Sequence, residues 1–381
     1  MSKIKEVTVY TTGDSAKIST WSNVPFFFTK TLIAKGIKVN RVNISPVLLI
    51  EKIYNKSILL LLKKLNWNPT YNYFRTYIHF LYVRIIIKHS TRKYKNSDAN
   101  IFMTFSFSSG RYRNKLSVLF HDWTYHHYFK YFEEREPDIF ERACIKREDK
   151  QIKSSDLLLP LFPGIANYMN ERYYEKNIKY LGNVINSEIK VDAAEIIEKK
   201  LQSQKLLFVG SEKYINAAKS LILAFEHLRK KNAEMELHFI GIESQDLEPL
   251  PKRVICHGYL DKGNENERNL YYQLFRDARL FINTSTKWGA FSATVEAMYF
   301  YIPVVIAPYN EFTKTFGHDI DFGSYCEKNE SVLIAEKIAE LMQKKDYTLL
   351  CNNAHNAVKG FTWDAYIDKV LEAIAKELQT K

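Results

Sequence analysis

The sequence predicts an α/β protein made of two doubly wound, Rossmann-like domains. The chain has 381 residues, which is more than one hydrophobic core usually holds. Hydrophobic residues make up 46% of it and charged residues 26%, as in ordinary globular proteins. Strand-like and helix-like segments alternate along each half, and a strand–helix–strand order implies parallel strands. Each half is therefore expected to form its own parallel sheet covered by helices.

The N-terminal domain is expected to span residues 1–185, together with a terminal helix at 364–381. It opens with the β-branched run Glu6–Thr11, which reads as a strand. A turn, a helix that Gly36 ends and a second strand complete a first βαβ unit. The expected elements after Glu6–Thr11 are helices at 21–35, 57–65, 71–88 and 139–153 and strands at 37–44, 101–107, 116–121 and 156–161.

The C-terminal domain is expected to span residues 186–363 and to repeat the same order of elements. A polar, helix-like stretch at 187–204 is expected to lead into it. In doubly wound sheets, ligands bind at the carboxyl ends of the strands. The expected strands lie at 206–209, 236–240, 253–257, 280–283 and 304–307, and the expected helices at 216–230, 269–277, 292–300 and 331–344.

The cysteines and the apolar runs limit the class of protein. The four cysteines lie far apart without a CxxC pair, which argues against a zinc site or a disulfide framework and favours a reducing compartment. No N-terminal signal sequence is visible, and no apolar run approaches the ~20 residues that span a bilayer. We expect a cytoplasmic protein that uses no metal or other cofactor. The cysteines are Cys144, Cys256, Cys326 and Cys351.

Positive charge is concentrated in one region of the chain. The net charge is +12, and residues 52–115 hold thirteen Lys or Arg and a single acid, Asp98, among many aromatic residues. This pattern favours an anionic membrane surface, so we expect a peripheral location on the inner face of the cell membrane. A solvated helix face is the plain alternative. Nucleic acid would also suit the charge, but the region lacks a recognised nucleic-acid-binding motif, so nucleic acid is not an expected partner.

Residues 280–298 hold the most informative pattern for chemistry. A strand ends near Asn283, a loop carrying Gly289 follows, and a helix begins near Ser292. Small residues and free backbone N–H groups at a helix N-terminus favour a phosphate. Glu296 lies about one turn into that helix, where a carboxylate can accept hydrogen bonds from two hydroxyls of a ribose. The segment therefore predicts a nucleotide site.

This segment resembles the family-4 glycosyltransferases (glycosyl transferases group 1) of GT-B fold. The matching positions, in order, are Thr284-Ser285, Gly289, Glu296-Ala297-Met298 and Pro303-Val304-Val305. The resemblance implies two Rossmann-like domains facing an interdomain cleft, a C-terminal helix that returns to the N-domain, and transfer of a sugar from a nucleotide-sugar donor. The donor-binding residues that it and the adjoining loops imply are Gly13, Ser211, Lys213, Gly258, Tyr259, Trp288, Gly289, Phe291, Ser292, Ala293, Thr294, Glu296 and Glu311.

The sequence departs from this family where the donor sugar and diphosphate should bind. The family's first Glu falls on Trp288, or on Lys287 after a one-residue slip, so no acid is present. The usual Arg is replaced by Ser211, and the usual Lys falls near Asn216. Neutralising the leaving diphosphate is a large electrostatic requirement. Either another cation, Lys213 or Lys219, replaces the missing Arg and Lys, or the donor is one whose leaving group is a monophosphate.

Candidate catalytic and acceptor residues lie in the N-terminal half. His121 and Asp122 end a strand, where the family often places a His near the sugar, and Asp14 follows Gly13 in the first βα loop. The plain alternatives are a structural histidine and an ordinary turn. If the enzyme inverts the anomeric centre, Asp14, His121 or Asp122 is the expected base. Stacking of acceptor sugar rings is expected on the aromatic loop that carries Trp123, His126 and His127.

The resemblance implies a retaining glycosyltransferase that acts on a glycan or glycolipid acceptor in cell-surface polysaccharide synthesis, such as lipopolysaccharide or capsule. Two other functions suit the same fold. One is a nucleotide-sugar epimerase. The other is a catalytically degenerate subunit that binds glycan or a partner, which the missing Glu, Arg and Lys would explain. Asp319 and Asp321 match the metal-binding DxD motif of the other glycosyltransferase fold, but in a GT-B protein we interpret this match as a coincidence.

Overall fold

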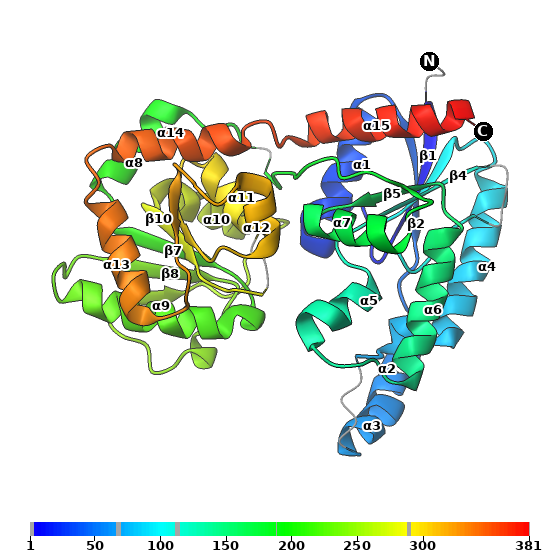
Figure 1. The fold of residues 1–381 in the computed structure, drawn as a ribbon, viewed down its shortest axis with the longest axis horizontal. Helices are drawn as coiled ribbons and strands as arrows, with labels where there is room; N and C mark the ends of the chain where they lie inside the picture. The colour runs from blue at the N-terminus through cyan, green and yellow to red at the C-terminus, as the bar shows by residue number, and fades with distance from the viewer. Residues whose placement is uncertain (1–3, 66–69, 111–114, 188, 288–290, 381) are drawn as a thin grey trace. The chain divides into compact units, whose positions relative to one another are not determined.

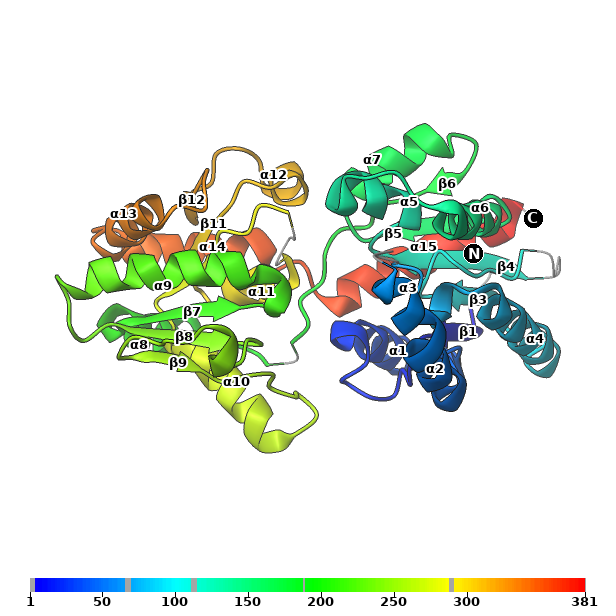
Figure 2. The same ribbon diagram turned by 90° about the horizontal axis from the view of Figure 1, so that it is seen from below.

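The computed structural model describes residues 4–65, 70–110, 115–187, 189–287 and 291–380 (Figure 1). The chain divides into two compact units. Unit 1 comprises Met1–Asn183 with Trp363–Lys381, and unit 2 comprises Val184–Thr362. Figure 2 shows the same elements from a second side. Each unit is built around one six-stranded sheet, so the predicted α/β fold with two doubly wound domains is confirmed.

Unit 1 has the strand order β2-β1-β3-β4-β5-β6, and every pairing within it is parallel. The chain turns from one side of β1 to the other between β2 and β3, so β1 and β3 flank the switch point where ligands of such sheets bind. The strands are β1 (Glu6–Thr11), β2 (Lys38–Asn43), β3 (Ala99–Phe102), β4 (Leu116–His121), β5 (Leu157–Pro160) and β6 (Asn177–Ile178).

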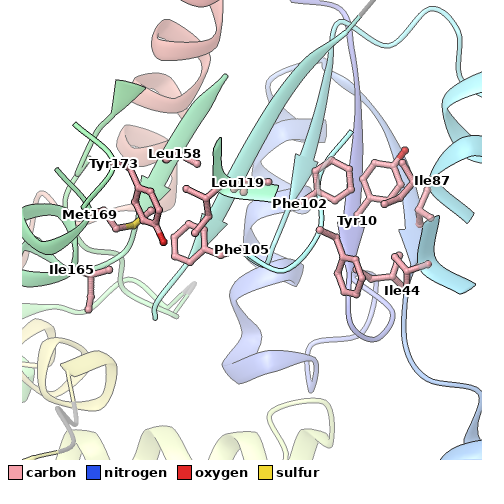
Figure 3. Packing of buried hydrophobic residues seen from close by; sticks show 14 residues of the cluster. Tyr10, Ile44, Ile87, Phe102, Phe105, Leu119, Leu158, Ile165, Met169 and Tyr173 are labelled. Carbon is pink, nitrogen blue, oxygen red and sulfur yellow. The ribbon is translucent and has the colours of Figure 1, made fainter. Parts of the chain in front are cut away.

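The core of unit 1 lies between this sheet and its helices. Tyr10 of β1 and Phe102 of β3 stack at 4.2 Å, and Leu119, Leu158 and Met169 extend the cluster along the sheet (Figure 3). The helices of this unit are α1 (Val24–Ala34), α2 (Leu48–Tyr54), α3 (Leu60–Lys64), α4 (Tyr77–Lys93), α5 (Tyr125–Tyr128), α6 (Ile139–Lys153), α7 (Pro163–Arg172) and α15 (Trp363–Thr380).

Helix α15 belongs to unit 1 although it comes last in the sequence. Tyr366 packs edge-on against Phe120 of β4 at 6.1 Å, and Trp363 packs against Phe28 of α1 at 6.2 Å. Lys35, which follows α1, binds the carboxylate of Asp364 at 2.7 Å. The apolar stripe of α15 is thus buried on α1 and β4, which is why the helix is found with this unit.

Unit 2 has the strand order β12-β11-β10-β7-β8-β9, again all parallel. Renumbered within the unit, this is the order 3-2-1-4-5-6 of dinucleotide-binding folds, with the switch point between β7 and β10. Its strands are β7 (Lys205–Val209), β8 (Glu236–Ile240), β9 (Val254–Cys256), β10 (Leu280–Asn283), β11 (Val304–Ile306) and β12 (Gly323–Tyr325). Its helices are α8 (Ala193–Gln202), α9 (Ile215–Arg229), α10 (Glu265–Asp277), α11 (Phe291–Tyr299), α12 (Asn310–Phe316), α13 (Ser331–Met342) and α14 (Tyr347–Val358).

Several predicted boundaries shift for local reasons. The helix expected from residue 71 begins at Tyr77, because the Thr76 side chain caps it by accepting from the His79 N–H. The helix expected over 187–204 begins at Ala193, where Asp192 caps it in the same way. The strand expected over 101–107 ends at Phe102. The sequence does not predict β6, β12, α2, α5, α7, α12 and α14. The aromatic segment expected to be a loop thus contains α5.

No helix among the described residues is both long and apolar enough to cross a membrane.

Candidate active site

The switch point of unit 2 places the ends of β7 and β10 together at the carboxyl edge of the sheet. After β10 the chain makes a side-chain-supported turn, because Asn283 Oδ1 accepts from the Ser285 N–H at 3.0 Å. Thr284 Oγ1 donates to Asn329 Oδ1 at 2.7 Å. The turn leads toward α11, the helix in which the sequence predicts the nucleotide site. Two predicted donor-binding residues, Trp288 and Gly289, and the Phe291 side chain lie outside what the structure describes.

Glu296 lies on α11 and is only 3% exposed. Lys262 Nζ donates to its Oε1 at 2.7 Å and to its Oε2 at 3.0 Å. The hydroxyl of Tyr271, on α10, donates to Oε2 at 2.9 Å. Burial, followed by the Glu296 charge, raises the pKa of Tyr271 well above its usual value, so the phenol remains a donor. Sequence reasoning predicted Glu296 but missed Lys262 and Tyr271, because only the fold brings these segments together.

Lys262 is as buried as the carboxylate that it binds. Its third donor contact is the Asn186 carbonyl at 3.2 Å, and its Nζ lies 4.1 Å from the centre of the Tyr271 ring. The ring of Tyr272 is 5.2 Å away. A buried ion pair is costly to desolvate, and removing one partner alone typically costs about 3–5 kcal/mol. The pair therefore keeps both side chains in fixed positions.

Three glycines stand at the carboxyl ends of β7, β8 and β9, where neighbouring chains come close together. The Gly241 N–H donates to the Gly258 carbonyl at 2.7 Å, and a Cβ at Gly241 would lie 2.5 Å from the Gly210 carbonyl oxygen. Gly258 has φ +62°, and a Cβ there would lie 2.5 Å from Glu243 Oε1. A side chain at Gly241 would clash with backbone, and the positive φ of Gly258 disfavours one there, although the Glu243 side chain could move aside. The backbone conformation therefore favours glycine at predicted position Gly258 whatever ligand binds. Its neighbour Tyr259 is exposed.

The other predicted donor residues divide by burial. Ser211 and Lys213 are both exposed. Ser211 precedes the 3₁₀ turn Glu212–Tyr214 that follows β7, and Lys213 lies within this turn. Ser292 is exposed and Ala293 half-buried, so the start of α11 is accessible at those positions. Thr294 on α11 and Glu311 on α12 are buried, at 0% and 5% exposure, so their side chains face the interior of the unit.

In unit 1, His121 and Asp122 form a pair at the end of β4. His121 Nδ1 lies 2.6 Å from Asp122 Oδ1, and both side chains are a little under one-third exposed. Burial lowers the pKa of His121, but the adjacent Asp122 carboxylate more than offsets this, so the pKa of His121 is raised. Burial raises the pKa of Asp122, and His121 more than offsets it, so the pKa of Asp122 is lowered. The pair favours an imidazolium next to a carboxylate.

A strained segment packs on this pair. Trp21 stacks on His121 with ring centres 4.9 Å apart. Trp21, Ser22 and Asn23 have φ values of 36°, 52° and 70°, which non-glycine residues rarely adopt. The helix predicted from residue 21 therefore starts at Val24. A strained backbone that is held against a charged pair is typical of functional sites, and no local pattern in the sequence indicates it.

The first βα loop, where Gly13 and Asp14 are predicted to contact substrate, is largely occupied by its own hydrogen bonds. The Gly13 N–H donates to Ser45 Oγ at 2.7 Å, so it is engaged within the protein. Gly13 has φ +99° and lies at the sharp turn after β1. Asp14 is exposed, and its Oδ1 accepts from the Ala16 N–H at 2.9 Å. Asp14 thus closes an Asx turn, which was the plain alternative for this loop.

The predicted acceptor residues form one aromatic cluster. Trp123 stacks on His127 at 5.4 Å, and His127 lies 4.3 Å from the ring of Tyr168 on α7. His126 Nδ1 contacts the hydroxyl of the same tyrosine. Burial and then Arg172 lower the pKa of His126, so this ring is favoured in its neutral form. The structure adds Tyr168, which lies on a helix that the sequence reading missed.

Glu148 of α6 was not predicted and lies behind this cluster. It is 5% exposed, and its carboxylate accepts from the Tyr125 N–H at 2.5 Å and from Ser106 Oγ at 2.9 Å. Burial raises its pKa. Together with Arg75 and Arg147, it lines a small pocket that has room for little more than one water molecule. These hydrogen bonds to Tyr125 and Ser106 join α5 to the segment that follows β3.

Comparison with known proteins identifies the class of protein. Residues 203–344, which lie almost wholly in unit 2, match the family profile described as glycosyl transferases group 1. No curated protein matches the chain in sequence. Sucrose-phosphate synthase from Thermosynechococcus elongatus has a similar structure, with a TM-score of 0.69 over 99% of this chain and 100% of its own, at 14% identity.

Two further solved structures extend the comparison. Anabaena Alr3699/HepE, solved with UDP and glucose, has a TM-score of 0.61 over 98% of this chain and 99% of its own, at 13% identity. A putative UDP-N-acetylglucosamine 2-epimerase from Listeria monocytogenes has a TM-score of 0.60 over 100% and 98%, at 12% identity. At these low sequence identities, the similarity to the three structures is a similarity of fold.

The fold and the matched domain together define a GT-B glycosyltransferase. More particularly, unit 2 carries the glycosyl transferases group 1 domain, so the resemblance to the family-4 enzymes is confirmed.

Proposed function

We propose that this glycosyltransferase takes its sugar from a nucleotide-sugar donor bound at the carboxyl edge of unit 2. The observation that carries this proposal is the carboxylate of Glu296, fixed on α11 next to the switch point between β7 and β10. Ser292 and Ala293, at the accessible start of the same helix, suit a diphosphate. Anabaena HepE, which shares the fold, was solved in complex with UDP and glucose, and this supports the same class of ligand.

The acceptor is proposed to bind unit 1, at the aromatic cluster of Trp123, His126 and His127 next to the His121–Asp122 pair. Stacked aromatic rings suit the apolar faces of sugars. The acceptor is a glycan or glycolipid of cell-surface polysaccharide synthesis, such as lipopolysaccharide or capsule, and the reaction retains the anomeric configuration without a metal. Should the reaction invert, the raised pKa of His121 means that the imidazole is a base only after it loses its proton.

A membrane location is proposed from the surface of unit 1. Residues 47–65, which we call the α2–α3 arm, extend from the sheet at the lower end of this unit in Figure 1. The arm exposes a row of large apolar side chains next to the exposed Lys52, Lys56 and Lys64. Apolar insertion flanked by cations suits the inner, anionic face of the cell membrane. The exposed apolar residues are Val47, Leu48, Leu49, Ile50, Ile53, Ile58, Leu60, Leu61 and Leu65.

The donor proposal is tested by thermal shift with UDP, GDP, ADP and CMP. One of them should raise the melting temperature, because a ligand that binds only the folded state stabilises it by mass action. Glu296→Ala should reduce this shift and lower sugar transfer about 100-fold or more, since a charge-assisted bond to the ligand contributes about 1.5–3 kcal/mol and the buried Lys262 loses its partner. Glu171→Gln, an exposed change in unit 1, is the control. Absence of any nucleotide-dependent shift would sink the proposal.

A nucleotide-sugar epimerase is the second candidate function, because the Listeria structure shares the fold over nearly the whole of both chains. The two are distinguished by incubating the nucleotide sugar without acceptor. Isomerised nucleotide sugar would favour the epimerase, whereas transfer only in the presence of acceptor supports the proposal. Binding of nucleotide without either reaction would indicate a degenerate, glycan-binding subunit.

A further inference from the structure

The contacts of Glu296 limit what it can still bind. An ionised carboxylate has about four acceptor positions, two on each oxygen. Among the residues that the structure describes, Oε2 accepts from both Lys262 and Tyr271, whereas Oε1 accepts from Lys262 alone. Three of the four positions are therefore occupied by the protein, and the remaining one is on Oε1. This is narrower than the sequence prediction, in which Glu296 was free to accept from two ribose hydroxyls.

Lys262 connects this carboxylate to the loop that follows β9. That loop runs from Gly258 to the start of α10, and its turn is closed by the Gly263 N–H, which donates to Asp261 Oδ1 at 2.8 Å. Arg268 holds the Lys262 carbonyl at 3.0 Å. The loop is thus well ordered by local bonds before Lys262 reaches across to α11. Movement of Lys262 would shift the carboxylate and the loop together.

All three protons of the Lys262 ammonium group are engaged. Two are directed at Glu296, and the third at the carbonyl of Asn186, on the segment that leads to α8. The faces of Tyr271 and Tyr272 cover the remainder of the charge. Such a lysine has no donor to offer a phosphate, so Lys262 is not the missing diphosphate cation. Its contacts instead fix the direction in which Glu296 Oε1 presents its last lone pair.

We propose that Lys262 is a positioning residue for nucleotide recognition, which orients Glu296 so that it accepts a hydrogen bond from one ribose hydroxyl only. This inference rests on the proposed function, because it takes the ligand of this edge to be a nucleotide. It adds a residue that the sequence pattern does not mark. It also predicts that removal of one ribose hydroxyl weakens nucleotide binding more than removal of the other.

The experiment measures dissociation constants by calorimetry for the nucleoside diphosphate that gives the largest thermal shift among UDP, GDP and ADP, and for its 2′-deoxy and 3′-deoxy forms. The wild-type protein should bind one deoxy form about tenfold more weakly and the other within about threefold, since one charge-assisted bond is lost in only one case. In Lys262→Met this selectivity should fall to within about twofold of equality. A purely structural lysine would weaken all three ligands by the same factor.

Lys205→Met is the matched control. Lys205 also pairs with a carboxylate, Asp277 Oδ2 at 3.1 Å, but it begins β7, at the opposite edge of the sheet from the site. Its removal should leave the ratio between the deoxy forms unchanged. If Lys262→Met does not fold, Tyr271→Phe removes one of the three bonds that orient the carboxylate and should reduce the selectivity partially.

The outcomes separate the inference from the proposed function. If the wild-type protein binds a nucleotide but both deoxy forms equally well, or both tenfold more weakly, the inference is wrong while nucleotide binding stands. Selectivity that survives in Lys262→Met, or that is undiminished in Tyr271→Phe where the first variant is unfolded, also overturns it. If no nucleotide binds at all, the proposed function fails and the inference fails with it.

Discussion

At the scale of single residues, the two candidate sites depend on paired charges. Sequence reasoning could mark His121, Asp122 and Glu296, because each lies at the end of a strand or near the start of a helix, where ligands of such sheets bind. It could not mark Lys262, Tyr271 or Glu148. Glu296 is 34 residues from Lys262 and 25 from Tyr271, and Ser106 is 42 residues from Glu148. Long-range contacts of this kind leave no local pattern.

The His121–Asp122 pair gives a prediction with a defined pH dependence. The pKa of His121 in the folded state is raised above its ordinary 6.5, so the stabilisation from the pair is lost as the pH rises from 6.5 through the folded-state value. At the acid end it is lost again, when the pH falls through the lowered pKa of Asp122. Asp122→Asn should therefore lower the pKa of His121 and cost about 1 kcal/mol at pH 6 and less at pH 9. NMR titration of the imidazole and urea unfolding measure the two effects, with Glu171→Gln as control. An unchanged His121 pKa would contradict the assignment.

At the scale of elements, strands and long helices were predicted well because hydrophobic periodicity is strong in them. Boundaries failed where caps decide them, as at Thr76 and Asp192. The strand β6, which has two residues, and β12, which has three, are too short to show a period. The sequence predicts a helix from Trp21, but the segment starting at this residue has positive φ values. Packing of Trp21 against His121 overrides the local preference for helix.

Helix α15 provides the prediction at this scale. Ile367 is 0% exposed on the stripe that packs against unit 1, so Ile367→Ala should lower the free energy of unfolding by about 2–4 kcal/mol through lost burial and a residual cavity. Gln379→Ala, at an exposed position of the same helix, should change it by less than about 0.5 kcal/mol. Urea unfolding followed by tryptophan fluorescence measures both. Equal effects of the two changes would mean that α15 is not an integral part of the unit.

At the scale of the whole molecule, the net charge of +12 is concentrated in the part of the chain that carries the α2–α3 arm. The protein should sediment with vesicles that contain about 30% anionic lipid, less so at high salt, because surface attraction is screened. Replacing Ile53 and Leu61 together by Glu should reduce binding about tenfold or more, whereas Leu223→Glu, on α9 of unit 2, should not. Equal sedimentation of both variants would reject the arm as the contact surface.

The return of α15 to unit 1 also has a consequence for synthesis on the ribosome. Unit 2 is inserted in the chain between residue 183 and residue 363 of unit 1. The surfaces of Phe28 and Phe120 are complete long before Trp363 and Tyr366 emerge to cover them. At about 5–20 residues per second, the delay between Phe120 and Trp363 is roughly 10–50 seconds. During it the second unit can finish folding while the first still exposes an apolar strip, which is a site where a chaperone would bind a nascent chain.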